Sequence, residues 1–234
     1  MRKEKGFTLV ELIVALFVGV LVMVAIYSTV NIAQRTSSGL ERRVIAQQDA
    51  RSALELMAAE IRMASYNPRS IDGIWFDANN FDTNCGVSGI TNQNYRGIRE
   101  AAANAISIEM DINDNGTIGD ANEIIRYNYD SANKNISRST NCGGAQAFLG
   151  DTNANEERKM VLVENNVSGI PVFRYYNGGG VELAAPVTSE IPNIKRVEIT
   201  LVADTSNADV GSTTRRRIIY STSVIPRNHF AKIY

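Results

Sequence analysis

The sequence predicts an α+β protein in which one long N-terminal helix, membrane-spanning in its first half, packs on an antiparallel β-sheet head. Three observations predict it. An uncharged apolar run lies near the N-terminus, apolar residues at helical spacing follow it, and the pattern then changes to strand-like alternation broken by Asn/Gly-rich segments. We expect a short basic segment at 1–6, the helix at 7–65 (7–34 in the membrane, 35–65 amphipathic) and the head at 66–234.

Composition excludes several protein classes. Of the 234 residues, 44% are hydrophobic and 21% charged, which excludes a disordered chain and a membrane protein with many spans. Lys+Arg 24 against Asp+Glu 25 gives a net charge of −1, so nucleic-acid binding is not expected. One histidine and two cysteines argue against a zinc or haem site. Because no nucleophile-elbow, zinc-protease or phosphate-loop motif is present, we do not expect an enzyme.

The apolar run is long enough to cross a bilayer. Residues 7–33 would form about 40 Å of helix, against a hydrocarbon core of about 30 Å. Basic residues before it should stay in the cytoplasm, which exports everything after Arg35. A secretory signal peptide is the alternative, but its apolar region would be half as long and end in a small-residue cleavage site.

One carboxylate, Glu11, interrupts the start of this run. A charge at the edge of an uncharged span is costly and often functional. In a plain membrane anchor, Glu11 would only reach the lipid headgroups.

The residues around Glu11 read Gly6-Phe7-Thr8-Leu9-Val10-Glu11-Leu12. This segment closely resembles the processing motif of type IV prepilins and of the pseudopilins of type II secretion. The resemblance implies a type IV pilin-like fold, cleavage by prepilin peptidase between Gly6 and Phe7, and N-methylation of Phe7. It also implies that Glu11 pairs with the Phe7 ammonium of a neighbouring subunit.

The same resemblance implies partners and a location. The partners would be other pilins and minor pilins, met through the N-terminal helix, together with prepilin peptidase and the inner-membrane assembly platform. The chain would cross the bacterial inner membrane once, with a periplasmic or extracellular head, and then enter a pilus or pseudopilus. No cofactor is required.

The helix should continue beyond the membrane as a nearly continuous amphipathic helix that ends at Tyr66-Asn67-Pro68. Ser37, Ser38 and Gly39 could let it bend at the membrane exit. Its predicted buried stripe is Leu40, Val44, Gln47, Leu54, Met57, Ile61 and Ala64. Many major pilins carry a proline in the apolar half. Because the first proline here is Pro68, the sequence favours a minor pilin or pseudopilin.

Alternation predicts the strands of the head. They are expected at 105–112 (half-buried), 123–129, 135–139, 160–164, 172–176, 194–203 and 216–224, with a turn at 177–180. The loop Asp111–Gly116, the Tyr127–Tyr129 strand and the Arg227-Asn228 pair resemble PilW-type minor pilins and the J-class pseudopilins.

An acidic loop in the head is a candidate Ca²⁺ site. Its oxygen-bearing residues are Asp111, Asn113, Asn115, Thr117 and Asp120, and the first three have the spacing of the start of an EF-hand loop. The alternative is a hairpin loop held by Asx-turns.

Other polar residues suggest structural roles. Cys85 and Cys142 would form a disulfide in an oxidising compartment, with two buried thiols as the alternative. Arg215–Arg217 could contact an anionic surface, but the start of a solvated strand is favoured. His229, near an expected exposed C-terminus, has no second ligand beside it.

Three functions therefore compete. The favoured one is a minor pilin that enters a type IV pilus or primes its assembly. The alternatives are a type II secretion pseudopilin and, from another class, a tip adhesin whose head binds a surface, DNA or a metal. A plain membrane-anchored domain, with Glu11 incidental, would leave Met1 as the N-terminus.

Overall fold

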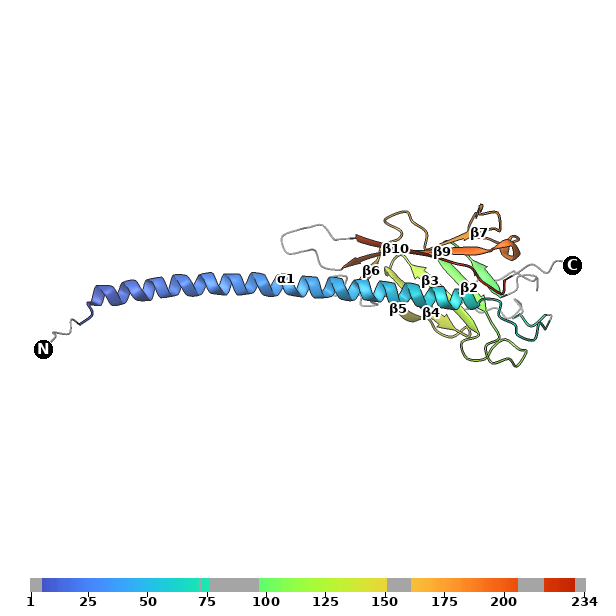
Figure 1. Cartoon of the computed structure of the whole chain (residues 1–234), viewed down its shortest axis with the longest axis horizontal. Coiled ribbons are helices and arrows are strands. Elements are labelled where there is room, and N and C mark those ends of the chain that lie inside the picture. Colours follow the sequence, from blue (N-terminus) through green and yellow to red (C-terminus); the bar gives the residue numbers. More distant parts are fainter. Residues whose placement is uncertain (1–5, 72, 76–96, 151–160, 206–216, 230–234) are drawn as a thin grey trace.

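The computed structural model describes residues 6–71, 73–75, 97–150, 161–205 and 217–229. One helix, α1 (Leu9–Met63), runs from the N-terminal end into a β-rich head. Figure 1 shows that the first half of α1 stands free as a stalk, while its second half lies along the head. This is the α+β, pilin-like layout that the sequence predicts.

The head contains two antiparallel sheets where the sequence suggested one. The first has the order β1-β2-β3-β4-β5, and the second has the order β10-β9-β7-β8, with β6 paired to β9. The first sheet comprises β1 (Ile98–Ala101), β2 (Ala105–Glu109), β3 (Ile124–Asp130), β4 (Asn135–Thr140) and β5 (Gln146–Leu149). The second comprises β6 (Val161–Val163), β7 (Phe173–Tyr176), β8 (Glu182–Leu183), β9 (Arg196–Thr205) and β10 (Arg217–Val224). A short 3-10 helix, η4 (Ile191–Asn193), precedes β9.

The predicted strands are found, but β1, β5 and β8 were not predicted. The interpretation of 105–112 as a half-buried strand is wrong, because β2 is buried on both faces and Ser107 is 0% exposed. Ser107 lies between Glu100 and Arg126 in the sheet register, and these two form an ion pair at 2.7 Å across it. Long charged side chains thus cover the face that alternation assigned to solvent. The turn at 177–180 is confirmed by the Gly180 amide, which donates to the Asn177 carbonyl at 3.1 Å.

The buried stripe of α1 begins later than predicted. Leu40 and Val44 are 58% and 51% exposed, because the head reaches down only as far as Ala46. The stripe that enters the core is Ala46, Ala50, Ala53, Leu54, Met57, Ala58, Ile61 and Ala64. Its small residues let the strands approach the helix axis closely. The helix runs without a break through Ser37–Gly39, the residues that could let it bend.

Polar contacts fix the position of the stripe on the head. Glu60 of α1 accepts a hydrogen bond from the Tyr127 hydroxyl of β3 and pairs with the Arg138 guanidinium of β4 at 2.8 Å. The Phe148 ring packs edge-on against Tyr127, with 4.9 Å between centroids. On the other sheet, the Arg51 guanidinium lies over the Tyr220 ring of β10 at 5.3 Å.

The helix ends earlier than the sequence suggests, and a histidine closes that end. Ser65 adopts a φ of 65°, and its amide donates to the Glu109 carbonyl at 2.9 Å. His229 is 1% exposed, which corrects the expectation of an exposed position. Its Nε2 lies 2.8 Å from the Ile191 carbonyl, which can only accept, so Nε2 carries the proton. In the neutral ring, Nδ1 then accepts from the Ser65 hydroxyl, which lies 2.8 Å away.

Candidate assembly site

The start of α1 is capped by the residues of the processing motif. Thr8 is the N-cap, and its hydroxyl accepts from the Glu11 amide at 3.3 Å. In return, one Glu11 carboxylate oxygen, Oε2, accepts from the Thr8 amide and the Thr8 hydroxyl, each at 2.9 Å. This reciprocal pair is a capping box, which satisfies amides that the first turn of a helix leaves open.

The second carboxylate oxygen of Glu11, Oε1, has no partner within the described part of the chain. Glu11 is exposed and lies at the positive end of the helix dipole, which favours an anion. The carboxylate can therefore keep its cap through Oε2 and still accept a cation from outside through Oε1.

The predicted cleavage bond lies just before this cap. Gly6 and Phe7 are exposed and non-helical, and Phe7 is 90% exposed. A Cβ built on Gly6 would meet no atom within 4 Å. A protease therefore has access to an exposed, non-helical backbone here. Cleavage and methylation at this bond stay predictions.

The helix beyond the cap offers a large apolar surface. α1 is long and apolar enough to cross a membrane once, and none of its most apolar window is buried. Leu12, Phe17 and Met23 are 62%, 63% and 71% exposed. Exposing such a large apolar surface to water is strongly unfavourable, so lipid or other helices must cover it.

The acidic loop of the head is held by its own hydrogen bonds. Asp111 is 0% exposed and accepts from the amides of Asn115 and Gly116 at 3.2 and 2.9 Å. The side-chain amides of Asn113 and Asn115 donate to Asp120 at 2.8 and 2.5 Å. Thr117 donates to Asn115 through its amide and its hydroxyl, each at 2.8 Å.

This arrangement favours the Asx-turn interpretation of the loop. The two asparagines present amide nitrogens to Asp120, and a nitrogen that carries hydrogens cannot ligate Ca²⁺. Over the described residues, no group of three or more His, Cys, Asp or Glu side chains is arranged to hold a metal. Whether the loop binds Ca²⁺ stays a prediction to be tested.

The remaining sequence-predicted residues are only partly described. Cys142 lies in the turn after β4 with a φ of 59°, whereas Cys85 lies outside the described residues, so the disulfide stays a prediction. Arg215 and Arg216 also lie outside them. Arg217 is the first residue of β10 and donates to Asp204 and Ser168 at 3.4 and 3.0 Å. Arg217 is thus engaged within the head.

Sequence reasoning does not find one feature of this site and one feature of the contact between α1 and the head. The sequence prediction gives Thr8 no capping role, although a Thr three residues before a Glu at the start of an apolar run is the signal of a capping box. The Glu60–Tyr127–Arg138 cluster gave no signal, because its members lie 67 and 78 residues apart in sequence.

The comparisons with known proteins agree with the N-terminal geometry. Residues 1–27 match the family model of the prokaryotic N-terminal methylation motif. No curated protein and no solved structure matches the chain significantly. The motif supports a type IV prepilin-like protein, processed by prepilin peptidase, anchored in the membrane and associated with other pilins.

Proposed function

We propose that this chain is a minor pilin that is incorporated into a type IV pilus, or primes its assembly, after cleavage between Gly6 and Phe7 and N-methylation of Phe7. The observation that carries the proposal is the Glu11 carboxylate. It lies at the start of the exposed half of α1, in which no residue from Leu12 to Gln34 is charged, and it has one oxygen in the helix cap and one without a partner in the described structure.

Assembly gives that unpartnered oxygen a use. Cleavage creates an ammonium on Phe7, and a neighbouring subunit can bring its ammonium to Oε1 while the apolar faces of the two helices pack. In such a poorly solvated setting, a carboxylate without a cation is strongly destabilised. The pair would therefore select the register of two packed helices.

The test uses cells that lack this chain and are complemented with the intact protein or a variant. Filaments are sheared from the surface and the amount of this chain in them is measured. Glu11→Gln keeps an oxygen that can accept the Thr8 hydrogen bonds but removes the charge, whereas Glu11→Ala removes both. We expect both variants to lose incorporation, while Glu55→Gln, an exposed acid further along α1, assembles normally.

Other results would overturn parts of this proposal. Normal incorporation of Glu11→Gln beside loss with Glu11→Ala would show that the cap matters and the ion pair does not. Normal pili in the absence of the chain, together with reduced export of folded proteins, would assign the chain to a type II secretion pseudopilus. Filaments that form normally but lose attachment would favour the tip adhesin.

A further inference from the structure

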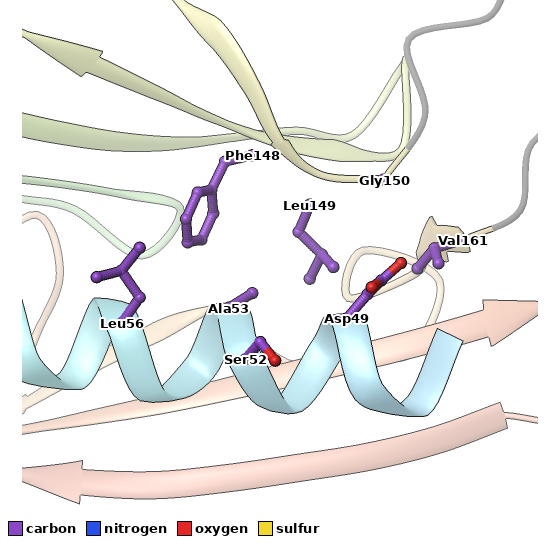
Figure 2. A pocket seen from close by; sticks show the side chains of 8 residues that line it. All are labelled: Asp49, Ser52, Ala53, Leu56, Phe148, Leu149, Gly150 and Val161. Atoms are coloured by element: carbon purple, nitrogen blue, oxygen red, sulfur yellow. The ribbon is translucent and has the colours of Figure 1, made fainter. Parts of the chain in front are cut away.

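The outermost strand of the second sheet, β10, presents a long sheet edge. A sheet edge leaves a row of backbone groups unpaired, and β1, β5, β8 and β10 end the strand orders of the two described sheets. β1 and β5 have four residues each and β8 has two, whereas β10 has eight. β5 also lies against α1, with Phe148 and Leu149 facing the helix (Figure 2). β10 is therefore the longest of these four edges.

The backbone of β10 turns three residues toward that edge. The pairing with β9 places Ser221 opposite Thr200, whose amide donates to the Val172 carbonyl at 2.9 Å, on the side away from β10. In an antiparallel pair, the residue opposite such a position turns its own amide and carbonyl outward as well. Because this alternates along the strand, Ile219, Ser221 and Ser223 all present both groups outward. In the described structure, none of these backbone groups has a hydrogen-bond partner.

This edge lacks the devices by which natural sheets prevent strand addition. Those devices are prolines, lysines, bulges and charges that point inward from the edge strand. The register of β10 on β9 is unbroken from Arg217 to Val224, and no proline or charged residue lies between these two residues. Ile219 is 55% exposed. The strand is thus long, regular and partly apolar, which makes it a template for a strand from another chain.

Arginines give this edge a charge preference. Arg51 of α1 lies over the Tyr220 ring of β10. Arg227 follows the strand, and its amide donates to the Arg62 carbonyl of α1 at 3.3 Å. All three arginines are exposed, and none has an ion pair in the described structure, while Glu55 is the one exposed acid of α1 between Arg51 and Arg62. The excess of positive charge favours an acidic partner and disfavours a second copy of the same edge.

We propose that the edge of β10 binds an extended acidic segment of a partner protein, which adds to the second sheet as a further strand. About five residues of such a segment span Ile219 to Ser223, and its amides and carbonyls pair with the outward groups there. β-branched side chains suit the pleated surface beside Ile219, and carboxylates pair with Arg51 and Arg227. This binding does not depend on the proposed function, because it uses only the head and the packed half of α1.

Peptide binding tests the proposal on the full-length protein in detergent. The probe is a fluorescent peptide of about seven residues, long enough to span the edge, that alternates Val and Thr between two terminal Glu residues. Its fluorescence anisotropy reports binding, and the same peptide with Lys in place of Glu is the control. We expect the acidic peptide to bind at least about tenfold more tightly than the lysine peptide. Equal binding of the two peptides, or no binding of the acidic one, would overturn the proposal.

Ser221→Pro tests the backbone pairing. It removes one outward amide and places a proline ring on the edge, while the amides that pair with β9 are retained. Ser221→Ala is the matched control, because it loses the same hydroxyl but keeps the amide. We expect Ser221→Pro to weaken binding of the acidic peptide about tenfold and Ser221→Ala to leave it unchanged. Equal binding by the two variants would contradict pairing at this edge.

Arg227→Glu tests the charge preference without changing the strand, and it keeps the proposal testable if Ser221→Pro does not fold. We expect it to weaken binding of the acidic peptide about tenfold and to improve binding of the lysine peptide. Arg35→Glu, the same reversal on the free half of α1, should change neither. An equal effect of the two reversals would overturn the role of Arg227.

Hydrogen exchange locates the added strand. On binding of the acidic peptide, the amides of Ile219, Ser221 and Ser223 should gain protection. Those of Tyr220 and Thr222, which already pair with β9, should not change. Protection gained only at other strands would place the peptide elsewhere and overturn the proposal.

Discussion

Glu60 joins the helix to the head through two neighbouring strands. Its carboxylate is 15% exposed and faces the Arg138 guanidinium, which is 22% exposed, and the Tyr127 hydroxyl. All three groups are largely removed from water. If one of them is lost, water cannot replace it, and the remaining groups are left without that partner. This differs from the pair of Arg69 and Asp114 at the surface, whose side chains are 54% and 55% exposed.

Glu60→Ala should therefore destabilise the protein by about 1–3 kcal/mol, because it strips the acceptor from Arg138 and Tyr127. Thermal unfolding of the full-length protein in detergent measures the effect. Asp114→Ala breaks an exposed pair and should cost less than about 1 kcal/mol. Equal losses in the two variants would contradict the role given to Glu60.

Tyr127 makes the cluster sensitive to alkali. Burial, and then the neighbouring Glu60 carboxylate, raise the pKa of its hydroxyl above the ordinary value of 10.0. Above that pH the unfolded chain releases this proton while the folded chain retains it, so folding stability falls as pH rises. We expect Tyr127→Phe to flatten this decline from about pH 10 upward. An unchanged slope would show that this hydroxyl does not contribute.

The end of α1 shows what can be read from sequence at the scale of an element. The long helix, its apolar half and seven strands follow from hydrophobic periodicity. The exact helix end does not, because it depends on Ser65, Glu109 and Gly97, which meet only in the fold. The strands β1, β5 and β8 are short, and β1 is buried on every residue, so no alternation marks it. Similarly, Leu40 and Val44 share the helical spacing of the stripe but lie below the head.

Gly97 marks the closest approach at this end. Its φ is +73°, and a Cβ there would lie 2.6 Å from the Ser65 Cα and 2.7 Å from the Glu109 carbonyl oxygen. Because both obstacles are backbone, Gly97→Ala should cost about 3 kcal/mol, measured by thermal unfolding. Gly144→Ala, where a Cβ would meet nothing within 4 Å, is the control and should be near neutral. A tolerated Gly97→Ala would mean that the helix end is not packed as described.

The acidic loop is expected to keep its shape without metal. Its side chains already satisfy its amides, so the melting temperature should be the same in EDTA and in excess CaCl₂. Asp111→Ala should lower that temperature in both solutions, because it removes the acceptor for two loop amides. A rise in melting temperature with Ca²⁺ that is lost in Asp120→Ala would instead establish the metal site.

At the scale of the whole molecule, the fold divides α1 into a free half and a half that is packed on the head. The free half of α1 carries the exposed apolar surface and begins with the capped Glu11. The head packs on the other half (Figure 1). The sequence predicts the first part, because a contiguous motif encodes it. It does not predict how the head packs on α1, because Phe148 and Leu149 reach the helix only through the pairing of β5 with β4.

Mass spectrometry of the N-terminal peptide, from this chain isolated out of sheared filaments, tests the central claim most directly. The account predicts that the chain is present in those filaments and begins at Phe7 with a methylated amine. A chain found only in the membrane fraction, with Met1 still at its N-terminus, would contradict the account and leave a plain membrane-anchored domain.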